Sequence, residues 1–135
     1  MGAKASAGVH LIVDGYVNDP GTFTRATIEE MFSKVISALE MKALDKPQVY
    51  EVPVDPTVLE RVKRTGKFED EGGITAVVVI STSHLSIHCW PLQRFFSLDA
   101  FSCKDFDSDL AYSIVRETLG VSRANVTVLQ RHRPL

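Results

Sequence analysis

The sequence predicts an α+β protein, a two-layer α/β sandwich whose mostly antiparallel sheet carries two main helices on one face. Strand-like and helix-like segments follow one another in the order β-α-β-β-β-β-α-β. The links between the central strands are too short for the crossovers that parallel strands need. The 135 residues are enough for a single domain over 1–135.

The first half of the chain alternates between strand and helix signals. Residues 9–16 predict the first strand, and apolar side chains recur at the helical period over residues 25–43. Thr27 and Glu30 are expected to form a capping box at the start of this helix. Residues 48–54 predict a short strand, and its internal proline places it at a sheet edge.

A short helical segment and a polar stretch come next. Asp55 followed by Pro56 is typical of a helix N-cap and first turn, so a helical turn or two is expected there. Residues 66–73 are polar and rich in glycine, and we expect a flexible connection.

The second half of the chain contains most of the sheet. A second helix is expected from Asp107 to the stop at Gly120, with a closing strand at 126–129. Both helices then cover one sheet face and leave the other open, which predicts a homodimer. The three remaining strands are predicted at residues 74–81, 85–90 and 95–103.

Composition excludes several classes of partner. Lys and Arg number 15 against 17 Asp and Glu, so the net charge of −2 provides no basic field for nucleic acid or anionic lipid. The longest apolar run, Ala76–Ile80, is far shorter than the roughly 20 residues of a membrane span. With two cysteines and no secretory signal, we expect a cytoplasmic protein without nucleic-acid or membrane partners.

The central hairpin concentrates the chemically interesting side chains. If Pro91–Arg94 is a four-residue loop, the register of the flanking strands follows from it. The predicted pairs are Trp90 with Phe95, His88 with Ser97, Ser86 with Asp99, and Thr82 with Cys103. A thiol that is twenty residues away in sequence is thereby expected within about one residue of Ser83.

Other chemistries fit this segment less well. His84 and His88 would lie about 13 Å apart on a strand, so they cannot share a metal ion. Cys89 and Cys103 would point to opposite faces about 23 Å apart, which excludes a disulfide. A triad of Ser83, His88 and Asp99 is conceivable, but no nucleophile elbow is present. A serine and a histidine that only satisfy each other at a dimer interface remain an alternative.

The segment from Ser83 to Pro91, followed by Leu98 to Cys103, resembles the short bacterial and archaeal S-adenosylmethionine decarboxylases. The family pattern is roughly Glu-Ser-His-x-Ser/Thr-Ile-His-Thr-Trp-Pro-Glu and then Asp-x-Phe/Tyr-Thr-Cys-Gly. The spacings of five from Ser83 to His88 and of twenty from Ser83 to Cys103 both hold. Gly8 to Asp14 is also similar to the family's first strand, so the resemblance spans nearly the whole chain.

The resemblance implies self-cleavage between Thr82 and Ser83, which gives a β chain (1–82) and an α chain (83–135). Ser83 Oγ would attack the Thr82 carbonyl in an N→O acyl shift, and elimination would then leave a pyruvoyl group at position 83. His88 matches the base that removes the Ser83 Cα proton.

The pyruvoyl group derived from Ser83 would serve as the electron sink, the role that pyridoxal phosphate (PLP) has in other amino-acid decarboxylases. The resemblance implies no metal. It would form a Schiff base with the α-amine of a small amino-acid-type substrate, with Cys103 as the proton donor after decarboxylation. The expected enzyme is a homodimer of processed protomers that decarboxylates S-adenosylmethionine for spermidine synthesis.

Several positions depart from the family pattern. Thr82 replaces a glutamate before the cleaved bond, and Lys104 replaces the glycine after the cysteine. Leu92 replaces a glutamate that binds the substrate's ribose, and Phe68 is the nearest candidate for the aromatic residue that stacks on adenine. The chain is therefore interpreted as a self-processing S-adenosylmethionine decarboxylase. Alternatives are a diverged member acting on ornithine or arginine, and an uncleaved homologue that binds or regulates another subunit.

Overall fold

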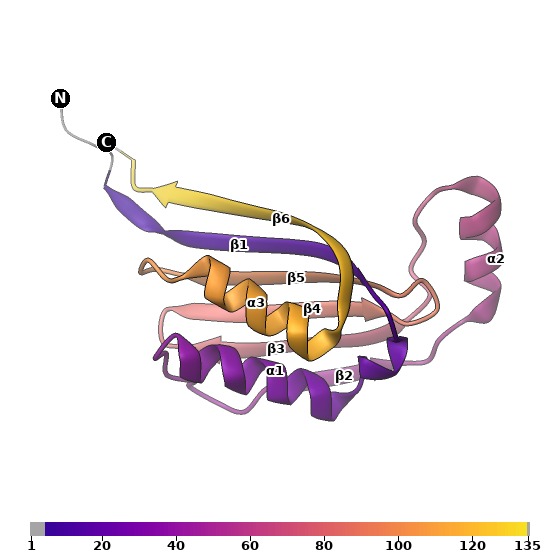
Figure 1. The fold of residues 1–135 in the computed structure, drawn as a ribbon, viewed down its shortest axis with the longest axis horizontal. Coiled ribbons are helices and arrows are strands. Elements are labelled where there is room, and N and C mark those ends of the chain that lie inside the picture. Colours follow the sequence, from indigo (N-terminus) through magenta and orange to yellow (C-terminus); the bar gives the residue numbers. More distant parts are fainter. Residues whose placement is uncertain (1–4, 135) are drawn as a thin grey trace.

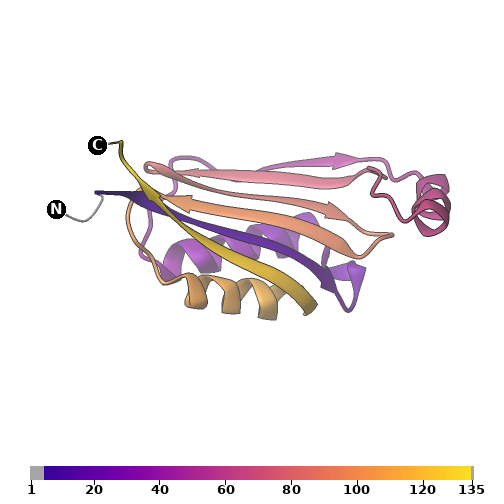
Figure 2. The same ribbon diagram turned by 90° about the horizontal axis from the view of Figure 1, so that it is seen from above.

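A six-stranded antiparallel sheet with two helices against one face forms the body of the protein (Figures 1 and 2). The computed structural model describes residues 5–134. The strand order is β2-β3-β4-β5-β1-β6. The predicted α+β sandwich with its two main helices on one face is confirmed. The elements are β1 (Ser6–Val17), η1 (Pro20–Thr22), α1 (Arg25–Ala38), β2 (Gln48–Val52), α2 (Pro56–Thr65), β3 (Gly73–Ile80), β4 (Ser83–Trp90), β5 (Phe95–Ser102), α3 (Ser108–Leu119) and β6 (Val121–His132).

Helix α1 begins at the predicted residue, Arg25, but it is capped differently and ends earlier than its sequence pattern predicts. Its N-cap is Thr24, whose hydroxyl accepts the amide of Thr27, so the predicted capping box at Thr27 is wrong by three residues. The helix ends at Ala38 rather than at residue 43. The left-handed backbone of Glu40, at φ 54°, turns the chain away from the helix.

The core lies between the two helices and the inward-facing half of every central strand. Each of β3, β4 and β5 buries alternate residues, as a half-covered sheet requires. Helix α1 contributes Ile28, Met31, Phe32 and Val35, and α3 contributes Ala111, Val115 and Leu119. This packing explains why α1 and α3 share one face.

Helix α2 stands apart, beyond one end of the sheet (Figures 1 and 2). Asp55 caps its first turn, Pro56 occupies the first helical position, and Gly66 ends it in the left-handed conformation at φ 70°. Both predicted start signals are confirmed. At ten residues, however, the helix is longer than the one or two turns expected. The apolar residues that indicated a helix in the sequence end at Val62, whereas the helix continues to its C-cap at Gly66.

The edge strands differ in how far they can be predicted. Strand β2 pairs with β3 alone at one edge, as predicted, but it ends at Val52, so Pro53 lies just beyond the strand rather than inside it. Strand β6 runs from Val121 to His132 and pairs with nearly all of β1, far beyond the predicted 126–129. The exposed polar residues of an edge strand hide its extent from a hydrophobicity pattern.

No helix or loop among residues 5–134 covers the sheet face opposite the two helices. Paired residues share a face, so the row Val79, His84, Phe101, His10 and Leu129 runs across this open face. Val79 and Leu129 are each about half exposed. In the described part of the chain, no helix has the length and apolar character needed to cross a membrane.

Candidate active site

The tight turn between β3 and β4 presents the predicted cleavage site. Ser81 and Thr82 form the turn, and Ser83 begins β4. Thr82 has φ 53°, which is a rare conformation for a β-branched residue. A left-handed backbone of this kind costs about 1–2 kcal/mol, so strain lies directly before the Thr82–Ser83 peptide bond.

Cys103 lies against this turn, as the predicted hairpin register requires. The register of β4 and β5 is confirmed, with Trp90 paired to Phe95 and Ser83 to Ser102. Cys103 follows directly, and its Sγ lies 2.7 Å from Thr82 Oγ1. Its backbone N–H donates to the Thr82 carbonyl over 3.4 Å. The exposed thiol is therefore within reach of a substrate held at the turn.

Ser83 itself is nearly buried, with 9% of its surface exposed. Its hydroxyl donates to Ser102 Oγ over 3.1 Å, and to the Ser81 carbonyl at 3.4 Å. Alternation along β4 points this side chain toward the helix-covered face. Thr82, Ser83 and Cys103 thus meet at one end of the sheet, together with Ser102.

His88 does not join this cluster within one chain. It lies five residues along β4 from Ser83, about 16 Å at 3.3 Å per residue. It also points to the open face, whereas Ser83 points inward. The conceivable triad fails for the same reason. Its third member, Asp99, lies beside His10, and the Asp99 Oδ1 to His10 Nε2 distance is 2.8 Å.

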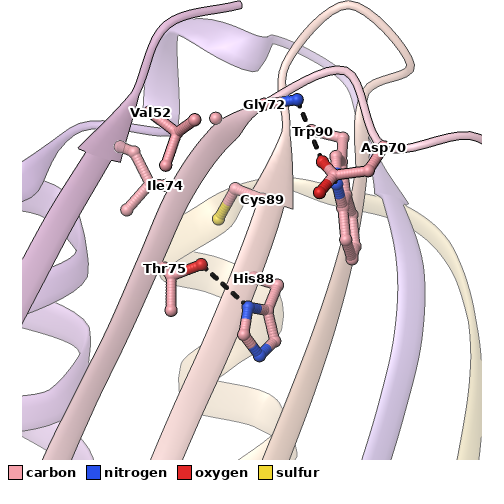
Figure 3. Close-up of a pocket in the computed structure, with 9 residues that line it drawn as sticks. Val52, Asp70, Gly72, Ile74, Thr75, His88, Cys89 and Trp90 are labelled. Carbon is pink, nitrogen blue, oxygen red and sulfur yellow. Dashed lines mark hydrogen bonds between the residues drawn. The ribbon is translucent and has the colours of Figure 1, made fainter.

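Thr75 orients His88 from the neighbouring strand. The two residues are paired across β3 and β4, and Thr75 Oγ1 lies 2.9 Å from His88 Nδ1 (Figure 3). The imidazole also stacks on Trp90, with the two ring centres 6.1 Å apart. Sequence reasoning missed Thr75, although the two-residue turn at Ser81 and Thr82 sets this pairing.

A small hollow of about 70 Å³ lies beside His88, and Asp70 and Trp90 contribute to its wall (Figure 3). Asp70 Oδ1 accepts hydrogen bonds from the Gly72 amide and from Trp90 Nε1, each over 2.9 Å. These bonds, the Gly72 one foremost, hold the pKa of Asp70 below its usual value. A carboxylate therefore stays charged beside the imidazole.

Phe68 and Leu92 line a second cavity, between α2 and the ends of β1 and β5. The cavity holds about 470 Å³ and has mostly apolar walls. Phe68 packs edge-on against Trp90 at 5.0 Å and against Phe95 at 6.0 Å between ring centres. Leu92 is partly exposed at its rim. Trp90 is seven residues from Ser83, so this cavity lies about 23 Å from the cleavage site in the same chain.

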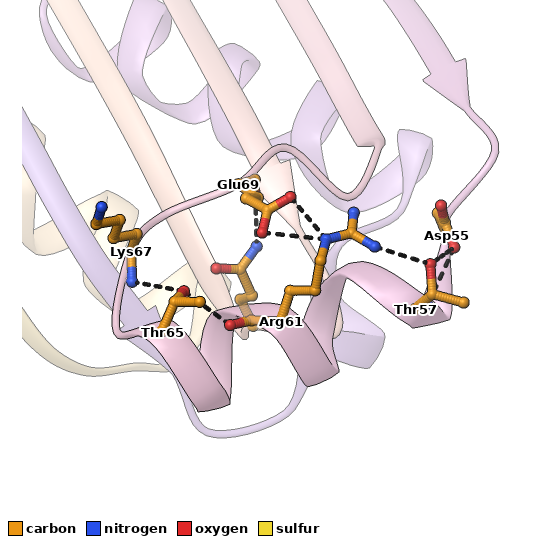
Figure 4. A network of polar contacts seen from close by, with 7 residues as sticks. Asp55, Thr57, Arg61, Thr65, Lys67 and Glu69 are labelled. Atoms are coloured by element: carbon orange, nitrogen blue, oxygen red, sulfur yellow. Dashed lines mark hydrogen bonds and ion pairs between the residues drawn. The ribbon is translucent and has the colours of Figure 1, made fainter.

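Polar contacts fasten the loop before β3 to the β4–β5 turn. The Arg61 guanidinium on α2 binds the Glu69 carboxylate at 3.0 Å, and Gln93 Nε2 donates to the Glu69 carbonyl (Figure 4). Glu71 is 1% exposed and accepts the amides of Leu92 and Gln93 over 2.7 and 3.0 Å. The segment expected to be flexible is thus anchored at both Glu69 and Glu71.

The two cysteines differ as their register predicted. Cys89 is buried in the core, and burial raises the pKa of its thiol to about 12. Cys103 is exposed at the turn. Both thiols are free.

Comparison with known proteins gives one consistent result. The family model described as S-adenosylmethionine decarboxylase matches residues 9–132. An S-adenosylmethionine decarboxylase proenzyme from Thermotoga petrophila is 39% identical over 62 residues, which are 45% of this chain and 48% of that protein. One from Pseudomonas paraeruginosa is 40% identical over 60 residues, 44% of this chain and 38% of the relative. The matched segment thus spans half or less of these curated relatives.

A solved structure has the same fold. The crystal structure of the adenosylmethionine decarboxylase from Aquifex aeolicus superposes with a TM-score of 0.71, covering 97% of this chain and 95% of that chain. The sequence identity is 21%, so this likeness concerns the fold alone.

Proposed function

This chain belongs to the S-adenosylmethionine decarboxylase family, and on that premise we propose that it is a self-processing, pyruvoyl-dependent decarboxylase. Cleavage between Thr82 and Ser83 gives chains 1–82 and 83–135. The observation that carries the proposal is the cluster at the β3–β4 turn. There the strained Thr82 lies within hydrogen-bond distance of the Cys103 thiol, and the hydroxyl of the next residue, Ser83, donates to Ser102.

The turn fits the formation of a pyruvoyl group from Ser83. Ser83 is the residue that follows Thr82, so its hydroxyl belongs to the residue next to the carbonyl that it would attack. The Cys103 backbone N–H donates a hydrogen bond to that carbonyl. Cleavage also releases the strain at Thr82. A pyruvoyl ketone supplies an electron sink for decarboxylation of an α-amino acid. In the described residues, no three metal-ligating side chains cluster.

Cys103 is the proposed proton donor to the substrate carbon after carbon dioxide leaves. Its Sγ lies at the turn, 2.7 Å from Thr82 Oγ1, and it is open to solvent. Cys89, buried under the sheet, does not reach this position.

His88 is the proposed base for the Ser83 Cα proton, and we place it in trans, in the second subunit of a homodimer. About 16 Å and opposite side-chain directions separate the two residues in one chain. The open sheet face exposes apolar side chains that a second copy would cover. Each active site then combines the turn of one protomer with the His88 and Thr75 of its partner.

S-adenosylmethionine, used in polyamine synthesis, is the proposed substrate. The cavity at Phe68 has the volume and the aromatic walls that suit a nucleoside. In the proposed dimer this cavity belongs to the His88 side of each site. The second candidate is ornithine or arginine, which Leu92 favours because leucine cannot accept hydrogen bonds from ribose hydroxyls.

Intact mass and carbon dioxide release test the proposal. Wild-type protein is expected to separate into two chains that split at Ser83, and Ser83→Ala is expected to stay at 14.9 kDa. Release of carbon dioxide from S-adenosylmethionine, ornithine and arginine, measured side by side, identifies the substrate. A wild-type chain that stays whole would instead support the uncleaved regulatory homologue.

Complementation tests the shared site. Ser83→Ala and His88→Ala chains are each expected to remain whole when expressed alone. When they are co-expressed, the His88→Ala chain keeps its Ser83 and receives His88 from its partner, so it alone is cleaved. If the His88→Ala chain stays whole in the mixture, His88 does not act in trans.

A further inference from the structure

The Ser83 side chain lies opposite Ser102 on the helix-covered face of the sheet. The Ser83 hydroxyl donates to Ser102 Oγ over 3.1 Å, and both residues are nearly buried, at 9% and 5% exposed. The next inward-facing residues along the two strands, Leu85 and Ala100, are apolar. The two hydroxyls therefore lie in contact, largely shielded from water.

The Ser102 hydroxyl has a second contact that fixes its orientation. Its Oγ accepts the backbone N–H of Lys104 over 3.2 Å. With the Ser83 hydroxyl on the other side, both lone pairs of Ser102 Oγ are engaged. Its own proton is then left to donate.

We propose that Ser102 positions the Ser83 hydroxyl for self-cleavage and relays its proton, an inference that rests on the self-cleavage proposed above. In the acyl shift, a bond forms from Ser83 Oγ to the Thr82 carbonyl carbon, and the Thr82–Ser83 C–N bond breaks. Ser102 Oγ accepts the proton of Ser83 Oγ and passes its own proton to the Ser83 nitrogen, which the broken C–N bond leaves as an amine. Ser102 is unchanged afterwards, so no co-reactant is needed.

The residue after Ser102 assists the same step. As Oγ attacks, the Thr82 carbonyl oxygen gains negative charge, and the Cys103 amide already points to it over 3.4 Å. A backbone N–H in this place stabilises the developing oxyanion. The end of β5 thus orients the nucleophile through Ser102 and polarises the carbonyl through Cys103.

The experiment follows cleavage of freshly synthesised precursors by intact mass. Ser102→Ala is expected to slow cleavage on the order of 100-fold, the effect of a misplaced reacting group. Ser102→Thr keeps the hydroxyl and is expected to recover most of the wild-type rate. The matched control is Ser113→Ala, because the Ser113 hydroxyl only donates to a carbonyl within α3.

Hydroxylamine identifies the step, since it cuts an ester and leaves an amide intact. Because His88 is the proposed base for the step after ester formation, a His88→Ala chain is expected to form the ester and stall, and hydroxylamine is then expected to cleave it between residues 82 and 83. In the same background, Ser102→Ala is expected to lower this cleavage at least about 10-fold.

The possible outcomes separate a failure of the proposed function from a failure of the role proposed for Ser102. A wild-type chain that never cleaves refutes the proposed function, and the inference falls with it. If the wild-type and Ser102→Ala precursors are cleaved at the same rate, the Ser102 hydroxyl does not assist self-cleavage. The same conclusion follows if the Ser102→Thr precursor is cleaved as slowly as the Ser102→Ala precursor. Equal hydroxylamine cleavage with and without Ser102→Ala also overturns the inference, because ester formation is then independent of Ser102.

Discussion

Replacing Glu71 tests whether a buried carboxylate holds the loop before β3 against the β4–β5 turn. Its two oxygens accept the amides of Leu92 and Gln93 over 2.7 and 3.0 Å, and the residue is 1% exposed. Each hydrogen bond to a charged group contributes about 1.5–3 kcal/mol. In Glu71→Ala, water that enters the vacated space can accept hydrogen bonds from the two amides and so recovers part of this stabilising free energy. We expect a net loss of about 3 kcal/mol in the free energy of unfolding.

Urea denaturation followed by circular dichroism measures this loss. The experiment is done in the Ser83→Ala background, at one protein concentration, so that neither cleavage nor dilution changes the reference. Glu71→Gln keeps the shape but turns an NH2 group toward a backbone N–H, so it is expected to be destabilising as well.

Glu69→Gln is the matched control. The Glu69 side chain is 36% exposed and pairs with Arg61 near the surface, so its loss is expected to cost less than about 1 kcal/mol. If Glu71→Ala costs no more than this control, the Glu71 carboxylate does not anchor the turn.

Three further predictions concern single side chains. At pH 8, iodoacetamide is expected to label Cys103 in the native protein and not Cys89, whose pKa of about 12 leaves about one thiolate in 10,000; native labelling of Cys89 in a peptide map would contradict this. Because the pKa of Asp70 is lowered, its stabilising effect is present above the unfolded value of 3.8 and is lost as pH falls through the lower folded value. Asp70→Asn is therefore expected to reduce the loss of unfolding free energy at acid pH and to remove the acid-induced change in Trp90 fluorescence. If neither pH dependence changes, the hydrogen bond between Asp70 and Trp90 does not contribute as described. Leu92→Glu is expected to raise kcat/KM for S-adenosylmethionine about 10-fold through new hydrogen bonds, and an unchanged value would show that position 92 does not contact the nucleoside.

The register of the central hairpin could be predicted from the sequence because a four-residue loop determines every pair behind it. That register placed Cys103 at Thr82 correctly. The left-handed Thr82 could not be predicted, since no local pattern requires φ 53° at a threonine. The role of Glu71 also needed the structure, because the path of an irregular loop follows from tertiary contacts rather than from periodicity.

The separation of His88 from Ser83 is a different case. Alternation along a strand already sends an odd and an even residue to opposite faces. The prediction began this strand at Leu85, so Ser83 was not counted on it. The true start of β4 at Ser83 reveals both the distance and the opposite orientation.

The strand order has a consequence for the proposed cut after Thr82. The 1–82 piece supplies β1, β2 and β3, while the 83–135 piece supplies β4, β5 and β6. In the order β2-β3-β4-β5-β1-β6 the strands of the two pieces alternate. Three pairs of neighbouring strands, β3/β4, β5/β1 and β1/β6, join one piece to the other by hydrogen bonds. After the proposed cut, three backbone ladders are expected to hold the two pieces together without a covalent link. Once unfolded, however, they must find each other again, so the cut protein is expected to refold at a rate that depends on concentration.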